Sequence, residues 1–167
     1  VPIRRLPAGR RPFRLGATMT KKILLGLVLF AIAIQFIRPE KNDSPVGPED
    51  LAALYPPPPA VKQLLGTACY DCHSNQTRYP WYAQVQPVGW WLASHINDAK
   101  DQLNFSEFGS YDEHRRAKKL QSLSDEVTDR SMPLKSYTWI HRDAKLTDTQ
   151  IKLLADWAEE LADKIEP

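Results

Sequence analysis

Two cysteines and a histidine form the most constraining feature of this 167-residue chain. Residues 69–73 read Cys-Tyr-Asp-Cys-His, the C-x-x-C-H pattern that is typical of c-type haem attachment. Thiols three positions apart project from one turn of backbone, so both can bond to the vinyl groups of one porphyrin. The histidine that follows is then placed as the proximal iron ligand. We therefore expect one covalent haem c per chain, held by Cys69, Cys72 and His73.

Three other uses of the cysteine pair stay open at this point. A thioredoxin-like redox pair needs a strand–helix–strand setting, and no such pattern surrounds the motif. A zinc site needs further ligands, but the chain has no second C-x-x-C and no H-x-x-x-H. A local disulfide is compatible with an oxidising compartment. Haem attachment is favoured because the five-residue pattern is the most specific of these signals.

Charge is divided unevenly along the chain. Up to Arg38 there are eight basic residues and no acidic one, which leaves fourteen basic against twenty acidic residues for the remainder. The predicted folded part is therefore acidic. Nucleic-acid binding depends on clustered Lys and Arg against phosphate, so we expect no nucleic-acid partner.

The N-terminal region combines a basic tail with an apolar run. Residues 1–22 form the tail, and Met19 followed by two lysines is typical of a translation start, so one hypothesis is that residues 1–18 are not translated. The alternative is a disordered cytoplasmic tail. Residues 23–37 are almost wholly apolar and would span about 22 Å as a helix, against about 30 Å for a bilayer core. No small-x-small cleavage site follows, so we favour an uncleaved transmembrane anchor over a signal peptide.

The remaining chain divides into a tether and one helical domain. Residues 38–60 are rich in proline and are predicted to form an extended tether, whereas residues 61–167 are predicted to form the haem-binding domain. Apolar residues recur at helical spacing in four segments of that domain. These predicted helices are Val61–His73, Val88–Leu103, Asp112–Asp125 and Leu146–Ile165. The fold class that we expect is all-α, a small cytochrome c-like domain around one haem, preceded by a single membrane helix.

Beyond C-x-x-C-H, an ordered series of short motifs resembles the bacterial haem-binding-domain family. The segments that carry the resemblance are Cys69–Asn75, Tyr79–Tyr82, Pro87, Trp90 and Trp91, His95 and Ile96, Leu103–Phe108, Met132 and Pro133, Tyr137, and His141. The resemblance covers about residues 22–165. It implies a small, membrane-anchored, single-haem protein similar to c-type cytochromes.

The second axial ligand of the iron has two main candidates. Met132 is the one methionine after residue 19, and it precedes Pro133 in a predicted loop between the haem motif and the terminal helix, as in class I cytochromes c. A thioether is a soft neutral ligand, so Met132 is the favoured distal ligand. His95 lies on the apolar stripe of its predicted helix and is the alternative distal ligand. His141 is a third candidate, expected instead to fix the loop by a hydrogen bond.

Aromatic and basic residues supply the remaining site predictions. Trp81, Tyr82 and Trp91 lie in a segment dense in aromatic residues and are predicted to wall the haem crevice, with an ordinary small core as the alternative. The basic cluster between His114 and Lys119 is interpreted as a solvated helix face. Its alternative interpretation is a docking patch for an acidic redox partner.

Together these features predict an electron carrier rather than an enzyme. An iron with both axial positions filled has no open site for a substrate and cycles between its ferric and ferrous states. The alternative function is a haem sensor or a peroxidase-like enzyme with an open sixth position. The basic residues before the apolar run favour a cytoplasmic N-terminus. We therefore expect a single-pass inner-membrane protein whose C-terminal domain lies in the periplasm and exchanges electrons with redox proteins of the cell envelope.

Overall fold

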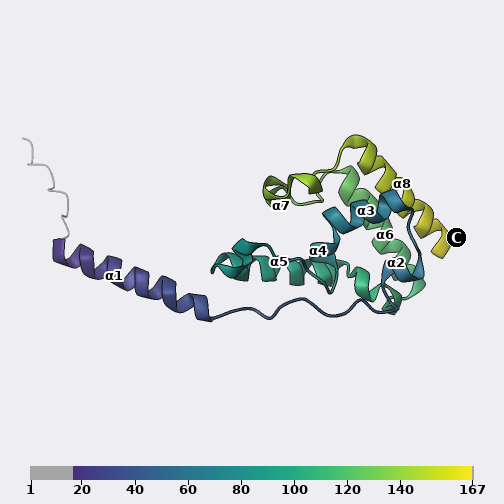
Figure 1. Ribbon diagram of the computed structural model, residues 1–167. Coiled ribbons are helices and arrows are strands. Elements are labelled where there is room, and N and C mark those ends of the chain that lie inside the picture. The colour runs from purple at the N-terminus through teal and green to yellow at the C-terminus, as the bar shows by residue number, and fades with distance from the viewer. Residues whose placement is uncertain (1–16, 167) are drawn as a thin grey trace, which may run out of the picture. The chain divides into compact units, whose positions relative to one another are not determined.

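The structure is a computed structural model that describes residues 17–166. Within this range the regular elements are all helical, as the sequence predicts (Figure 1). The α-helices are α1 (Ala17–Ala33), α2 (Leu51–Leu54), α3 (Pro59–Ala68), α4 (Tyr70–His73), α5 (Val88–Gln102), α6 (Glu113–Thr128), α7 (Lys135–Ile140) and α8 (Asp148–Ile165). The short 3-10 helices are η1 (Ile34–Phe36), η2 (Trp81–Gln84), η3 (Phe105–Ser110) and η4 (Arg142–Ala144). The chain divides into two units at Arg38, and each is described by itself.

The first unit contains the predicted apolar helix. Thr18–Phe36 is the one described helix that is long and apolar enough to span a membrane, with a mean hydropathy of 1.8 over its most apolar stretch. Its 19 residues correspond to about 28 Å, because the helix starts before the apolar run and includes Lys21 and Lys22. The helix is therefore close to the thickness of a bilayer core, about 30 Å, whereas the apolar run alone would be too short to span it. A signal sequence near the N-terminus meets the same criterion. The basic tail up to residue 16, with most of the segment preceding Met19, lies outside the described residues.

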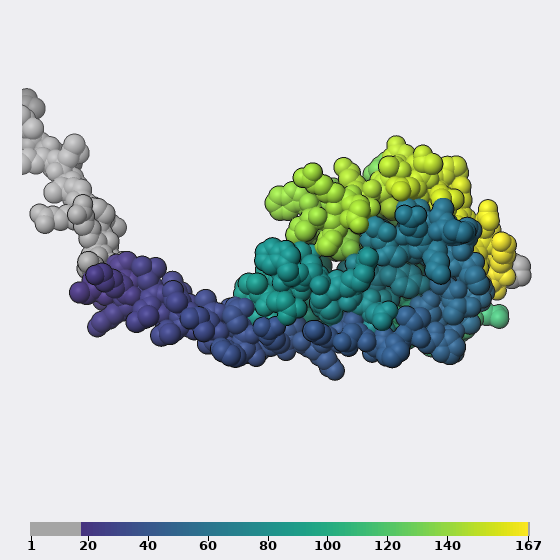
Figure 2. All heavy atoms as spheres, in the orientation of Figure 1, coloured from purple at the N-terminus to yellow at the C-terminus, as the bar shows by residue number. Residues whose placement is uncertain are grey.

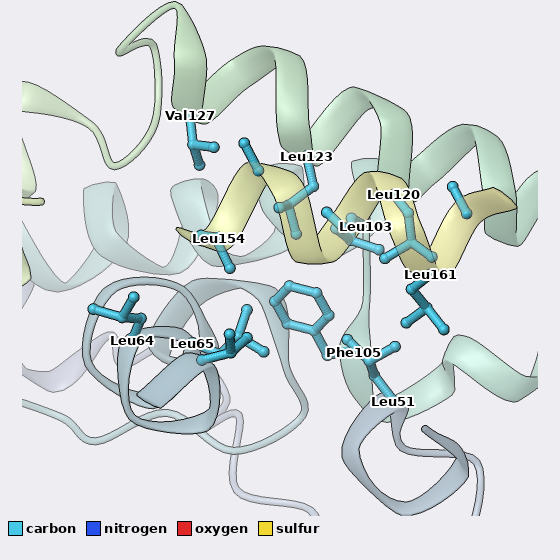
Figure 3. Packing of buried hydrophobic residues seen from close by; sticks show 14 of the residues in the cluster. Leu51, Leu64, Leu65, Leu103, Phe105, Leu120, Leu123, Val127, Leu154 and Leu161 are labelled. Carbon is cyan, nitrogen blue, oxygen red and sulfur yellow. The ribbon is translucent and has the colours of Figure 1, made fainter. Parts of the chain in front are cut away.

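The core of the second unit forms where α6 and α8 pack together and α3 lies against α8 (Figure 3). The predicted stripes of α6 and α8 face inward. Their buried residues include Ala117, Leu120, Leu123, Leu154, Ala158 and Leu161. At the start of α8, Thr147 and Gln150 form a capping box, a pattern that can be recognised in the sequence, with the Gln150 backbone N–H donating to the Thr147 hydroxyl. The terminal helix contacts α3, the helix that leads into the haem motif.

The folded unit begins earlier than the sequence suggests. Residues 38–60 are predicted to be a tether, yet Leu51 has 0% of its side chain exposed and belongs to the core. Asp50 caps α2 by accepting a hydrogen bond from the Ala52 N–H at 2.9 Å, and its carboxylate also accepts one from the Tyr70 hydroxyl at 3.1 Å. A four-residue helix between prolines has too few residues to show helical periodicity, so the sequence pattern predicts a tether where the structure has a core segment.

Residues 42–44 are also fixed to the domain. Asp43 forms an isolated antiparallel bridge with Gln76, three residues after the haem motif. The side-chain amide of Asn42 donates to the Ser74 carbonyl at 2.7 Å and to the Thr77 hydroxyl at 2.9 Å. The start of the predicted tether is thus an extended strap held against the loop that follows the haem motif.

Candidate functional site

The haem motif lies on a separate turn of helix. The single predicted helix from Val61 to His73 is interrupted at Cys69, whose φ of −126° and ψ of −47° lie outside helical geometry. The Cys69 carbonyl then accepts hydrogen bonds from the N–H groups of Cys72 at 3.1 Å and His73 at 3.0 Å. These two hydrogen bonds close a separate helical turn. The spacing of the two sulfurs and the imidazole is therefore set by this turn and not by a continuation of α3.

A cavity of about 540 Å³ lies beside this turn, bounded by α3, α6 and the loop before α7. Of the predicted site residues, Cys69, His73 and Met132 line it together, and Cys72 does not. Its apolar lining also comprises Ala68, Leu103, Phe105, Leu123, Val127 and Pro133. The sequence pattern does not link these apolar residues to the site, because they come from four separate segments and show only the spacing of an ordinary core.

His73 is oriented by a backbone contact. Its Nδ1 lies 2.9 Å from the Leu103 carbonyl oxygen, which can only accept, so Nδ1 carries the proton and Nε2 keeps its lone pair. Burial lowers the pKa of His73, which favours the neutral imidazole that a metal requires. A fixed tautomer with a free Nε2 is the arrangement of metal-binding histidines in general.

The two cysteines are free thiols in partly buried positions. Burial, with the neighbouring Cys72 as a smaller cause, raises the pKa of Cys69 to about 12. Burial raises the pKa of Cys72 to about 11, and Asp71 adds to this effect. Both groups are therefore protonated thiols at neutral pH. Within residues 17–166, no three His, Cys, Asp or Glu side chains gather as the ligands of a metal ion.

Met132 is brought to the cavity by the way in which α6 ends. Arg130 adopts a left-handed conformation with a φ of 57°. The Arg130 N–H donates to the Val127 carbonyl at 3.2 Å, and the Ser131 N–H donates to the Glu126 carbonyl at 3.0 Å. This pattern is a Schellman motif, and the Met132 N–H adds a further bond to the Glu126 carbonyl at 3.0 Å. The Met132 backbone is therefore fixed to the C-terminus of α6.

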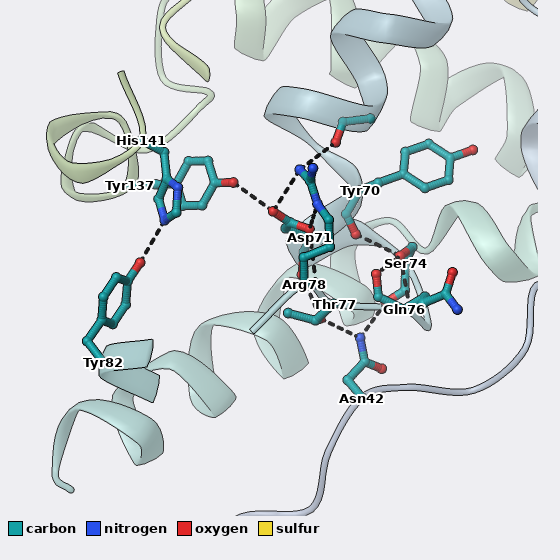
Figure 4. Close-up of polar contacts among 11 residues, drawn as sticks. Asn42, Tyr70, Asp71, Ser74, Gln76, Thr77, Arg78, Tyr82, Tyr137 and His141 are labelled. Atoms are coloured by element: carbon teal, nitrogen blue, oxygen red, sulfur yellow. Dashed lines mark hydrogen bonds and ion pairs between the residues drawn. The ribbon is translucent and has the colours of Figure 1, made fainter. Parts of the chain in front are cut away.

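Asp71, inside the haem motif, connects the motif to α7 (Figure 4). Its carboxylate accepts hydrogen bonds from Arg78 Nε at 3.0 Å and from the Tyr137 hydroxyl at 2.9 Å. The Arg78 guanidinium also donates to the Gly66 carbonyl at 3.0 Å, at the end of α3. This network cannot be predicted from the sequence, since no short-range pattern links Asp71 to a tyrosine 66 residues away.

The other predicted site residues lie away from the cavity lining. The side chain of Trp81 is 80% exposed and that of Trp91 is 48% exposed. The His95 ring contacts the Trp91 ring at a tilt of 46°, with centroids 4.2 Å apart, and its Nδ1 lies 3.0 Å from the Trp91 carbonyl oxygen. Their assignment to the haem site stays a prediction.

Tyr82 and His141 bridge η2 and the segment after α7. The Tyr82 hydroxyl lies 2.7 Å from His141 Nε2, and the His141 ring stacks on Tyr137 with centroids 4.4 Å apart. His141 therefore holds the loop by a hydrogen bond, as the sequence suggests. In Figure 2 residues 135–144 form a lobe that projects from the second unit.

The residues present fit a haem on two counts. A mainly apolar cavity suits a porphyrin plane, and its lining brings together a thiol, an imidazole with a free Nε2 and a thioether. These are the three kinds of group that a c-type haem takes from a protein.

Comparison with known proteins agrees with this fit. A family profile described as haem-binding domain matches residues 29–160. No curated protein and no solved structure matches the chain. The matched range covers most of the chain and contains the C-x-x-C-H motif, the cavity and Met132. The chain therefore belongs to the haem-binding domain family.

Proposed function

We propose that this protein is a membrane-anchored electron carrier with one haem, attached covalently through Cys69 and Cys72. The observation that carries the proposal is that Cys69, His73 and Met132 line one cavity, although Met132 lies in a segment far along the chain from the motif that contains Cys69 and His73. Haem binding is a property of the family. The covalent bond, the two axial ligands and the electron-transfer role are the proposed part.

The attachment chemistry follows from the thiols. Each protonated sulfur would add across one vinyl double bond, with sulfur joined to one carbon and hydrogen to the other. One C–S bond and one C–H bond would then replace the S–H bond and the carbon–carbon π bond, so no net oxidant is needed. The raised pKa values of Cys69 and Cys72 mean that the bare motif holds little thiolate at neutral pH. A bound haem supplies the one-electron couple of its iron.

Two neutral ligands would set the properties of that couple. His73 offers Nε2, because the Leu103 carbonyl holds the proton on Nδ1. Met132 offers its thioether from the loop at the end of α6. Histidine and methionine together raise the reduction potential relative to two histidines, and an apolar cavity disfavours the more highly charged ferric state. The chain's own residues therefore favour a carrier of comparatively high potential.

The apolar helix supports a location at the membrane. Thr18–Phe36 would be a single-pass anchor in the inner membrane, with Lys21 and Lys22 at its cytoplasmic end. The haem domain would then lie in the periplasm, where c-type haem is attached and where redox proteins of the envelope are its partners. Fractionation of cells that produce the protein tests this part, with the domain expected in the membrane fraction and accessible to protease in spheroplasts.

The test of the proposal uses protein produced in cells competent in haem c maturation. The pyridine haemochrome spectrum should be of the c type and should survive denaturation and acid–acetone extraction. Cys69→Ala and Cys72→Ala should each leave one thioether bond, and the double variant should release all its haem on extraction. Full extraction of haem from the unaltered protein would contradict covalent attachment.

Carbon monoxide separates the electron carrier from the alternative of a sensor or peroxidase-like enzyme. The reduced protein should bind carbon monoxide slowly or not at all, because Met132 occupies the sixth position. Met132→Ala should bind it rapidly. Rapid binding by the unaltered protein would favour the open-site alternative.

A further inference from the structure

The cavity has two chemically different ends. Leu123, Val127, Met132 and Pro133 line one end, at the C-terminal half of α6. At the other end, the N-terminal half of α6 contributes basic side chains. Of the described residues that line the cavity, these are His114, Arg115, Lys118 and Lys119, and Glu126 is the one acidic residue. A binder of a wholly apolar ligand has no need of such cations, since each loses hydration when a ligand covers it.

The spacing along α6 separates the two ends. Arg115, Lys118 and Lys119 follow one another at helical intervals, so they share a face. Val127 lies nine residues beyond Lys118, which corresponds to about 13 Å along the helix. Of the cavity lining that α6 supplies, the N-terminal part is therefore basic and the C-terminal part is mainly apolar. A matching ligand is a large apolar ring with negative charge confined to one edge.

Some of these cations already have partners. The Lys119 ammonium donates to the Gln102 carbonyl and lies 4.8 Å from the centre of the Tyr111 ring. His114 Nδ1 lies 2.9 Å from a carboxylate oxygen of Glu166. Arg115 differs, because within residues 17–166 its guanidinium contacts the Tyr111 ring, 5.5 Å from its centre, rather than a carboxylate or a carbonyl. Among the described residues, no carboxylate forms an ion pair with Arg115 or Lys118.

We propose that Arg115 and Lys118, with Lys119 beside them, bind the two propionate carboxylates of the haem. These three residues are called the basic rim below. The inference rests on the proposed function, because it takes this cavity as the haem site. Guanidinium and ammonium groups are strong hydrogen-bond donors to carboxylates, and a pairing at the cavity mouth would orient the haem edge toward the N-terminal half of α6. The basic cluster that the sequence presents as a solvated face thus acquires a ligand.

The experiment compares one double holoprotein variant with two controls. Arg115→Gln and Lys118→Gln are combined and remove two positive charges; Lys118→Arg keeps the charge at the rim, and Lys62→Gln removes one positive charge away from the cavity. Lys62 is exposed on α3 and does not line the cavity. Three quantities are measured for each protein: haem content, the propionate-bending band in resonance Raman spectra, and the reduction potential.

The double variant should shift the propionate-bending band, because the carboxylates lose their donors. It should also lower the equilibrium constant for reduction by about tenfold, which is about 59 mV for one electron, because uncompensated carboxylates oppose the added electron. Lys118→Arg and Lys62→Gln should retain the band of the unaltered protein.

An unshifted band and potential in the double variant would overturn the inference. That result, accompanied by a salt-dependent loss of electron exchange with an acidic protein, would instead make the rim a docking patch. If the haem is bound but fully extractable, covalent attachment is contradicted and the inference about the basic rim still stands or falls by its own test. The propionate-bending band can be measured for haem that is bound without a covalent bond. A protein with no haem at all would overturn both proposals.

Discussion

The hydroxyl of Tyr137 donates a hydrogen bond of 2.9 Å to Oδ2 of Asp71, and so joins α7 to the centre of the haem motif. Tyr137 lies five residues after Met132, whereas Asp71 lies between the two cysteines. Arg78 holds the other carboxylate oxygen at 3.0 Å, so the acceptor is itself fixed. The segments that carry the two proposed axial ligands are thereby tied together by a bond that involves neither ligand.

Tyr137→Phe should weaken this tie. The loss of a partly buried hydrogen bond to a carboxylate should lower the free energy of unfolding by about 1–2 kcal/mol, which urea titration measures. The sulfur-to-iron band of the ferric holoprotein should also weaken, because α7 no longer holds the Met132 loop at a fixed distance from the motif.

Tyr79→Phe is the matched control for that substitution. The Tyr79 hydroxyl accepts a hydrogen bond from the Asn42 backbone N–H at 2.7 Å, so its loss also costs stability. It makes no contact with α7 and should leave the sulfur-to-iron band unchanged. Equal effects of the two substitutions on that band would remove any special role for the Tyr137 bond.

The same tyrosine predicts a pH dependence. Burial, then the charge of Asp71 and a hydrogen bond to it, and then Cys72, raise the pKa of Tyr137 above its ordinary value of 10.0, while Arg78 acts in the opposite direction. Above about pH 10 the unfolded chain therefore releases this proton before the folded chain does, and rising pH favours unfolding. The contribution of Tyr137 is intact below pH 10 and is lost above it.

Unfolding titrations at about pH 9 and about pH 11 check this sign. The unaltered protein should lose more stability between the two values than Tyr137→Phe does. Other tyrosines and lysines titrate equally in both proteins, so they cancel in the comparison. Parallel losses would show that the phenol of Tyr137 ionises as freely in the folded state as in the unfolded state.

Asn42→Ala tests whether the strap before α2 belongs to the folded domain. The Asn42 side chain donates to the Ser74 carbonyl and the Thr77 hydroxyl, and it accepts from the Lys100 ammonium at 2.7 Å. Removing three partly buried hydrogen bonds should lower the free energy of unfolding by about 1–3 kcal/mol. Asn97→Ala, at an exposed position of α5, should change it by less than about 0.5 kcal/mol. A neutral Asn42→Ala would return residues 42–44 to the tether.

Features that depend on near neighbours in the sequence could be predicted. The capping box of Thr147 and Gln150 and the amphipathic stripe of α8 both repeat within one or two turns of helix. The C-x-x-C-H motif is equally local, and it indicated the side of the cavity that Cys69 and His73 form. The position of Met132 followed from its order in the chain rather than from its surroundings.

Features that depend on tertiary contacts could not be predicted. Leu51 is a core residue because α3, α8 and η3 leave space for it, and nothing in its proline-rich surroundings indicates this. Trp81 lies in an aromatic-rich segment that is predicted to wall the cavity, but it is 80% exposed. The aromatic content of a segment does not specify which way a short 3-10 helix faces. The basic residues of α6 show the periodicity of a solvated face, and only the fold reveals that Lys118 lines a cavity.

The most direct test of the account is the sixth iron ligand of the ferric holoprotein. A His73–Met132 pair predicts the weak long-wavelength band of sulfur bound to ferric iron. The band should disappear in Met132→Ala and persist in Ser131→Ala, the exposed neighbouring position. Absence of the band from the unaltered protein would contradict the account and move the ligand to His95 or leave the iron open. Survival of the band in Met132→Ala would also contradict the account, because a sulfur other than that of Met132 would then be the ligand.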